Sequence, residues 1–143
     1  MTHTGTNIWL IMGRSLLALY FFVPGIAKLL SPDMQLTLMV HHNIPFSIPL
    51  LYIAGIAQVI GAIFLMTNRH VRKTAFGYVL YILIINYTLH DFWHFEGIEA
   101  AHELQNFIKN LGILAGLLVL AGISPKRSLL PLKLKTLFQS DNS

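Results

Sequence analysis

The segment HDFWHFEGIEAAHELQNFIKNLGILAGLLVLAG, residues 90–122, determines the architecture of this chain. It opens with the titratable cluster HDFWH at 90–94, passes through an acidic connector and ends in the apolar run 111–122. Residues 74–89, which precede it, are also apolar. A polar cluster between two segments that can enter a bilayer is costly unless its groups are paired or functional. The pattern predicts a helical membrane protein with a polar site near His90.

Composition excludes an ordinary soluble domain. Of the 143 residues, 55% are hydrophobic and 11% are charged, whereas soluble domains carry about 25% charged residues. The length favours a single small integral membrane protein. Because the chain has no cysteine, it cannot form disulfides or thiolate metal sites. The net charge of +4 does not indicate nucleic acid as a partner, because the basic residues flank apolar segments.

The predicted fold class is an all-α bundle of four transmembrane helices, at about 8–28, 48–67, 74–93 and 107–123. Each segment has close to the ~20 residues that cross a hydrocarbon core. Pro24 and Gly25 are expected to bend or end the first span before Lys28. The fourth span is long enough only if it starts near residue 107, which brings Lys109 and Asn110 into or beside the membrane.

Short interfacial helices are expected in the two outer connections. Residues 33–42 begin with a helix-start pattern, Ser-Pro-Asp, and are followed by a break at Asn43-Ile44-Pro45. Acidic and histidine side chains recur at helical spacing between 95 and 105, which favours an amphipathic helix on the membrane surface. His41 and His42 are expected to face water or lipid headgroups.

Four spans place both termini and the middle loop on the same side of the membrane. That side carries most of the basic residues, namely Arg69, Arg72, Lys73, Lys126, Arg127, Lys133 and Lys135. The positive-inside rule therefore places both termini in the cytoplasm, with residues 124–143 as a basic cytoplasmic tail, and the cluster around His90 outside.

The polar residues near the outer ends of the spans are the candidate site. His90, Asp91 and Lys109 are the predicted catalytic group, because a histidine beside a carboxylate can accept or pass a proton to a lipid-soluble redox carrier. A purely structural alternative is an ion pair between Asp91 and either Lys109 or Lys28. The candidate ligand-binding residues are Lys28, Asn86, Trp93, Asn106 and Asn110, with Arg14 and Gln58 deeper in their spans.

Three of these residues have alternative roles. Trp93 either forms an aromatic wall for a quinone ring or belongs to an interfacial belt of aromatic residues. Arg14 either extends to the cytoplasmic interface or pairs with Gln58 or an anionic headgroup. Gly112 and Gly116 form a GxxxG pattern, which is typical of helix packing.

Metal binding is not predicted. His90 and His94 are spaced i, i+4, and Glu99 and His102 have the Glu-x-x-His spacing. Di-iron bundles use two Glu-x-x-His motifs with further glutamates, and this chain has one such motif.

The chain resembles the DoxX family of small four-span bacterial inner-membrane proteins. The resemblance rests on Arg14, Gly25 with Lys28, the segment AGIAQVIG at 54–61, HDFW at 90–93, and residues 105–121. It implies a multi-pass protein of the bacterial inner membrane, and some members are membrane parts of oxidoreductase systems, including a relative of the small subunit of thiosulfate:quinone oxidoreductase. Gln58 departs from the family, whose members often have glutamate at this position.

The leading functional hypothesis is a membrane subunit of an oxidoreductase that binds a quinone-like ligand in an outward-facing pocket. The chain would be at most an accessory subunit, with the lipid bilayer, an oxidoreductase partner and further copies of itself as partners. The sequence identifies no cofactor with certainty, and a quinone is the one that the hypothesis suggests. The alternatives are a non-enzymatic assembly or carrier protein that binds a partner helix or lipid, and a small-molecule permease.

Overall fold

The computed structural model describes residues 7–125. Within that range it contains only helices: α1 (Ile8–Leu30), α2 (Asp33–His41), α3 (Ser47–Met66), α4 (Val71–Leu89), the 3-10 helix η1 (Phe92–His94) and α5 (Gly97–Ile123). The predicted all-α class is confirmed. The basic tail predicted beyond Pro125 lies outside the described residues.

Two parts of the sequence prediction are corrected. α1 continues through Pro24 and Gly25 to Leu30, so the first span does not end before Lys28. The interfacial helix expected at 95–105 is not a separate element, because residues 97–123 form one continuous helix, α5. No proline interrupts this segment, and Gly97 begins the helix with φ +62°, a left-handed conformation that glycine adopts readily.

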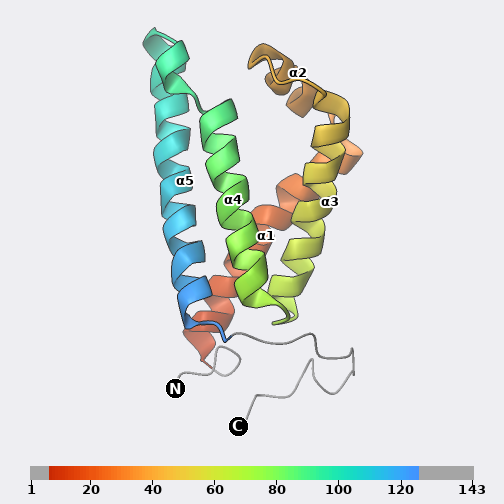
Figure 1. Ribbon diagram of the computed structural model, residues 1–143, viewed down its shortest axis with the longest axis vertical. Helices are drawn as coiled ribbons and strands as arrows, with labels where there is room; N and C mark the ends of the chain where they lie inside the picture. Colours follow the sequence, from red (N-terminus) through yellow and green to blue (C-terminus); the bar gives the residue numbers. More distant parts are fainter. Residues whose placement is uncertain (1–6, 126–143) are drawn as a thin grey trace.

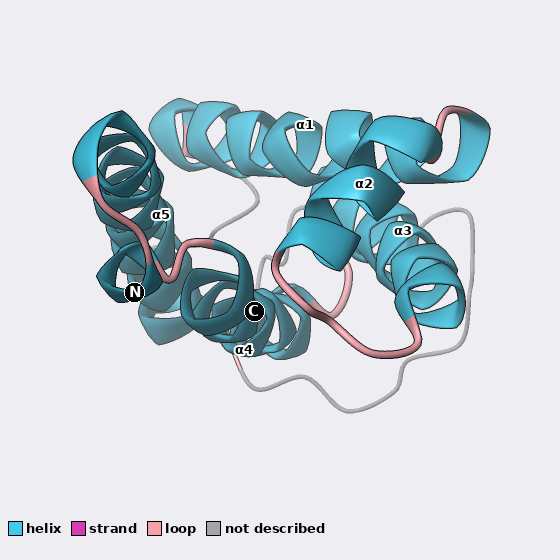
Figure 2. Ribbon diagram, turned by 90° about the horizontal axis from the view of Figure 1, so that it is seen from above, coloured by secondary structure: helices cyan, strands magenta, loops and turns pink. Residues whose placement is uncertain are grey.

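The long helices form two pairs, α1 with α3 and α4 with α5, and α1 runs diagonally behind α4 (Figure 1). The start of α1, the α3–α4 turn and the end of α5 lie at one end of the bundle. α2 and the α4–α5 connection lie at the opposite end, called here the connector end. Seen from above, α2 lies across the end of the α1–α3 pair, with α4 and α5 beside each other on the other side (Figure 2).

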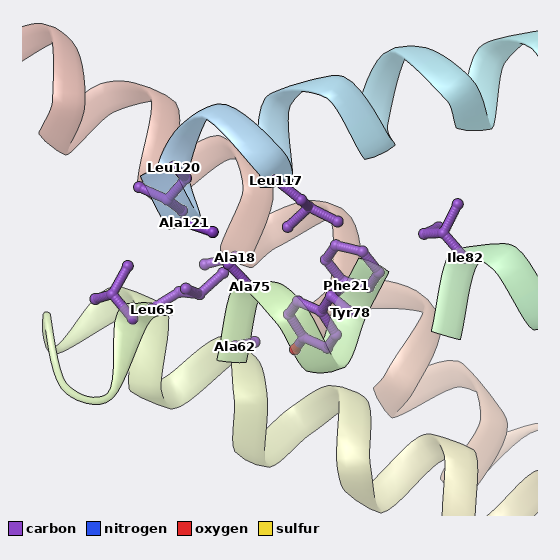
Figure 3. Close-up of a cluster of buried hydrophobic side chains, with 11 residues drawn as sticks. Ala18, Phe21, Ala62, Leu65, Ala75, Tyr78, Ile82, Leu117, Leu120 and Ala121 are labelled. Carbon is purple, nitrogen blue, oxygen red and sulfur yellow. The ribbon is translucent and has the colours of Figure 1, made fainter. Parts of the chain in front are cut away.

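A cluster of buried apolar side chains joins the two pairs in the half of the bundle nearer the α3–α4 turn (Figure 3). At its centre the rings of Phe21 and Tyr78 are stacked, with centroids 3.7 Å apart and planes 12° from parallel. Ala18, Ala62 and Ala75 are fully buried, so small side chains let α1, α3 and α4 approach one another. In lipid such contacts hold helices together by packing rather than by exclusion of water.

Gly25 of α1 and Gly55 of α3 form a close crossing of the first pair. A Cβ atom on Gly25 would lie 3.2 Å from the carbonyl oxygen of Gly55, and a Cβ on Gly55 would lie 3.2 Å from that of Gly25. The same Cβ on Gly25 would meet Gln58 Cβ at 3.0 Å, and that on Gly55 would meet Lys28 Cβ at 3.1 Å. This crossing therefore sets the positions of Lys28 and Gln58.

Three helices, α1, α3 and α5, are long and apolar enough to cross a membrane. α4 has 19 residues and carries Arg72 and Lys73 in its first turn, and it is not among these three. A four-span bundle with both termini inside remains a prediction.

Candidate functional site

A cavity of about 490 Å³ lies between the helix pairs beneath α2. Its walls are mostly aliphatic and aromatic, and its polar lining residues are Tyr20, Lys28, Gln35, Gln58, Tyr81, His90 and Asn110. Small-molecule sites in proteins typically have about 300–1,000 Å³ and an apolar wall with a few polar groups. Four of the residues proposed from the sequence, Lys28, Gln58, His90 and Asn110, thus share one cavity.

Lys28 is the most unusual of the lining residues. It is only 9% exposed, and its side chain has no ion pair or hydrogen bond with any residue of the described range. No aspartate or glutamate lines the cavity. The Oε1 atom of Gln58 is also buried without a hydrogen-bond partner among residues 7–125. Buried polar groups are normally satisfied, so these two groups mark a place where a ligand can supply the partner.

Asparagine side chains connect α4 and α5 at the cavity. Asn110 Nδ2 donates to Asn86 Oδ1 at 2.9 Å, and Asn86 Nδ2 donates to the carbonyl oxygen of Phe107 at 3.1 Å. Tyr20 of α1 donates its hydroxyl proton to Asn110 Oδ1 at 3.0 Å. Three helices are therefore tied together by a polar network beside the cavity.

Histidines and carboxylates form a second network at the connector end. Asp91 accepts from His42 Nδ1 at 2.8 Å with one oxygen and from His94 Nδ1 at 2.7 Å with the other. Glu103 of α5 accepts from His90 Nδ1 at 2.7 Å, and its other oxygen lies 4.0 Å from His42 Nε2. The His42 side chain is 0% exposed and that of His94 is 66% exposed. The network thus extends from the surface to the cavity wall at His90.

The surroundings of Asp91 favour its charged form. Burial, the largest single cause, raises the pKa of this carboxyl, but hydrogen bonds from His94 and His42, a backbone hydrogen bond and the electrostatic effect of His42 together lower it by more. The pKa of Asp91 therefore lies below its ordinary value. An ionised carboxylate here accepts two imidazole donors at once.

The predicted pairing of Asp91 with a lysine is wrong. Asp91 is paired with two histidines, and Lys109 lies exposed on the outer face of α5. Successive residues of a helix are about 100° apart, so the inward position of Asn110 turns Lys109 outward. The expectation that His42 faces water or headgroups is also wrong, whereas His41 is exposed and pairs with Glu99 at 2.7 Å.

The remaining candidate residues lie away from the cavity. Arg14 is buried near the opposite end of the bundle, where its Nη1 donates to Asn68 Oδ1 at 2.9 Å rather than pairing with Gln58. Trp93 is half-exposed and packs against the rings of Tyr87 and Phe92. Asn106 is half-buried and does not line the cavity.

No group of three or more metal-binding side chains is present within residues 7–125. The Glu-x-x-His pair is divided, because Glu99 contacts His41 and the His102 side chain is exposed.

Sequence reasoning missed His42, Glu103 and Tyr20. A sequence signal existed for Glu103, which is seven residues before Asn110 and therefore lies on the same face of a continuous helix. His42 and Tyr20 reach the site through contacts between distant helices, which no local pattern encodes.

These features define a multi-pass helical membrane protein with a mostly apolar cavity, lined by a few polar groups, near one end. The chain belongs to the DoxX family, whose model matches residues 9–91. The match ends at Asp91, so residues 105–121, on which the resemblance partly rested, lie outside it. No curated protein and no solved structure matches the chain.

Proposed function

We propose that this chain is a membrane subunit of an oxidoreductase system and binds a quinone-like, lipid-soluble ligand in the cavity beside Lys28 and His90. The observation that carries the proposal is Lys28, a residue that is 9% exposed and whose ammonium has no partner among the described residues, in a cavity without carboxylates. A charge within a membrane protein is costly without a partner. A ligand oxygen in the cavity would provide that partner.

The lining residues fit a quinone. The Lys28 ammonium can donate N–H groups to a ring oxygen, and His90, whose Nδ1 contacts Glu103, can donate through Nε2 when that nitrogen carries a proton. Aliphatic side chains such as Ile82, Ile85 and Leu89 line the rest of the wall and suit a ring and an alkyl tail. A bound quinone supplies the capacity to take up two electrons and two protons, and the proposal assigns the electron donor to a partner protein with its own redox cofactor.

The proposal includes a four-span topology in the bacterial inner membrane with both termini inside. Arg69, Arg72 and Lys73 lie at the end of the bundle opposite the cavity, which supports an inward orientation of that end. α4 runs beside α5 over most of its length, which supports its role as the fourth span. The cavity would then face the outer leaflet.

A two-part experiment tests the function. Protein purified in nanodiscs is extracted and analysed by mass spectrometry for co-purifying quinone, and a short-tailed benzoquinone is titrated while tryptophan fluorescence is recorded. We expect stoichiometric quinone in the extract. The variant Lys28→Met should bind the benzoquinone at least tenfold more weakly, while Lys109→Met on the outer face of α5 should bind like the wild type. Protein that carries only phospholipid and binds the benzoquinone equally well with or without Lys28 would contradict the proposal.

A second candidate function, a non-enzymatic assembly or carrier protein, is favoured by the groove between α1 and α5. This groove has about 480 Å³ and is lined by Gly13, Leu17 and Gly116 among others. A Cβ atom on Gly112 would meet nothing within 4 Å, and one on Gly116 would lie 4.0 Å from Leu17 Cδ2, so the GxxxG face makes little contact within the described residues. A partner helix captured by cross-linking at Gly13, together with a cavity that binds no quinone, would favour this function.

A further inference from the structure

The histidine–carboxylate network ends at the cavity wall, and its residues alternate between rings and carboxyl groups. In order from the surface they are His94, Asp91, His42, Glu103 and His90. We propose that these five residues form a proton relay that carries protons from the aqueous surface to a ligand in the cavity. The inference rests on the proposed function, because the ligand at its end is the quinone-like molecule proposed above.

The first observation is that the network joins two environments. The His94 side chain is 66% exposed, whereas the side chains of His42 and Glu103 are 0% and 8% exposed. His90 is in contact with Glu103 and also lines the cavity. A chain of purely structural hydrogen bonds has no need to connect the surface to a cavity in this way.

The second observation is that each member can receive a proton at one atom and release one at another. The Asp91 oxygens contact His94 and His42 separately, and the Glu103 oxygens face His42 and His90 separately. In each ring Nδ1 contacts one carboxyl, which leaves Nε2 for the other neighbour. Imidazole is well suited to this task because it accepts and donates through different nitrogens.

The transfer can be written so that protons balance. A proton from water binds His94 Nε2 while the Nδ1 proton passes to Asp91. In the structure His42 and His90 donate from Nδ1 to Asp91 and Glu103, so each ring first exchanges to the tautomer with its proton on Nε2. His42 then accepts at Nδ1 from Asp91 and releases the Nε2 proton to Glu103. Glu103 passes it to His90 Nδ1, and His90 Nε2 releases one proton into the cavity. Rotation of each carboxyl group and exchange of ring tautomers reset the relay.

The step from His42 to Glu103 is the control point. His42 Nε2 and Glu103 Oε1 are 4.0 Å apart, beyond hydrogen-bond distance, and Nε2 is buried with no hydrogen-bond partner among the described residues. A small rotation of Glu103 or one bridging water closes this gap. The titratable groups that face the relay from other elements are Lys28, Tyr20 and Tyr81 across the cavity, and the His41–Glu99 pair beside His42.

The test uses a coloured ligand whose protonation is visible. An alkylated 2-hydroxy-1,4-naphthoquinone is bound to the full chain in nanodiscs, and its absorbance is followed by stopped flow after a pH jump. We expect His42→Gln and Glu103→Gln to bind the dye within twofold of the wild type and to protonate it at least tenfold more slowly. Imidazole in the buffer should restore much of the rate. His41→Gln, outside the relay, is the matched control and should behave like the wild type.

Each outcome decides a different point. If the dye binds but both variants protonate it at the wild-type rate, the relay is wrong and the proposed function stands. If the dye does not bind to the wild type, both proposals fail. Slow protonation that imidazole does not restore, or that His41→Gln shares, would show a structural effect and overturn the relay. If both His42→Gln and Glu103→Gln fail to fold, His94→Gln at the exposed end tests the relay instead. Its protonation of the dye should also be slower than in the wild type and be restored by imidazole.

Discussion

Gly25 and Gly55 face each other across α1 and α3, and each is so close to the other's carbonyl oxygen that a side chain has no room. Because Lys28 and Gln58 are one turn further along the same helices, this crossing fixes the cavity wall. A change at either glycine should therefore affect both the stability of the helix pair and the shape of the cavity.

The first prediction concerns this crossing. Gly55→Val should separate α1 from α3 and lower the free energy of unfolding by about 1–3 kcal/mol, the usual cost of an overpacked contact. Thermal unfolding in detergent measures the effect. Gly112→Val is the control, because a Cβ at Gly112 meets nothing within 4 Å. Equal losses in both variants would contradict the close crossing.

The second prediction concerns the Asn86–Asn110 hydrogen bond. A double-mutant cycle with Asn86→Leu and Asn110→Leu should give a coupling free energy of about 0.6 kcal/mol, the average for such bonds within membranes, and no more than about 1.7 kcal/mol, the largest measured. Unfolding in SDS gives the four required values. Tyr20→Phe removes only the third bond of the network and should cost less than Asn110→Leu. A coupling of zero would mean that the two side chains do not meet.

The third prediction contrasts neighbouring histidines. His42→Leu leaves the carboxylate of Asp91 with one donor fewer in a buried place, and should destabilise the protein by about 1–3 kcal/mol. His41→Leu removes an exposed pair with Glu99, which is worth about 0–1 kcal/mol. Thermal unfolding of the two variants at neutral pH distinguishes these values. If His41→Leu destabilised the protein more than His42→Leu, then His41 rather than His42 would be the buried histidine.

The fourth prediction concerns acid stability. The folded pKa of Asp91 lies below its unfolded value, which is about 3.9 for an aspartate. Its ionised form therefore contributes stability that is fully present above pH ~4 and is lost as the pH falls through the lower folded pKa. The stability difference between wild type and Asp91→Asn should be constant near neutral pH and shrink below pH ~4.

Unfolding free energies measured from pH 7 to pH 3 test this expectation. Asp33→Asn, which alters an exposed carboxylate with no imidazole partner in the described structure, is the matched control. A difference between wild type and Asp91→Asn that is the same at pH 3 as at pH 7 would show that the two histidines do not lower the pKa of Asp91.

The apolar segments and part of the cavity could be predicted from sequence, because both depend on local composition. Lys28, Gln58, His90 and Asn110 stand out as polar residues within apolar helices, and a bundle must turn such groups toward its interior. The partners of Asp91 could not be predicted in this way. They depend on α2 folding back over the bundle and on the rotation of α5.

The error at Lys109 has a specific cause. The sequence prediction treats residues 95–105 as a separate surface helix. It therefore does not use the helical periodicity that places Glu103 and Asn110 on the same face. In the continuous helix these two residues are seven positions apart and share the inner face, while Lys109 lies outside. The unbroken helix therefore brings Glu103 rather than Lys109 to the network around Asp91, and the partners of Asp91 are His42 and His94.

The length of α5 relates the position of the cavity to the depth of the bilayer. Its 27 residues extend about 40 Å, roughly 10 Å more than the hydrocarbon core of a bilayer. When the end near Ile123 is level with one edge of that core, the other edge falls about 20 residues earlier, near Glu103. Glu99 and the exposed ring of His94 then lie among the headgroups, while the cavity stays at the depth of the acyl chains. A hydrophobic ligand would enter the cavity laterally from the lipid, whereas protons would enter from the aqueous side through a separate opening.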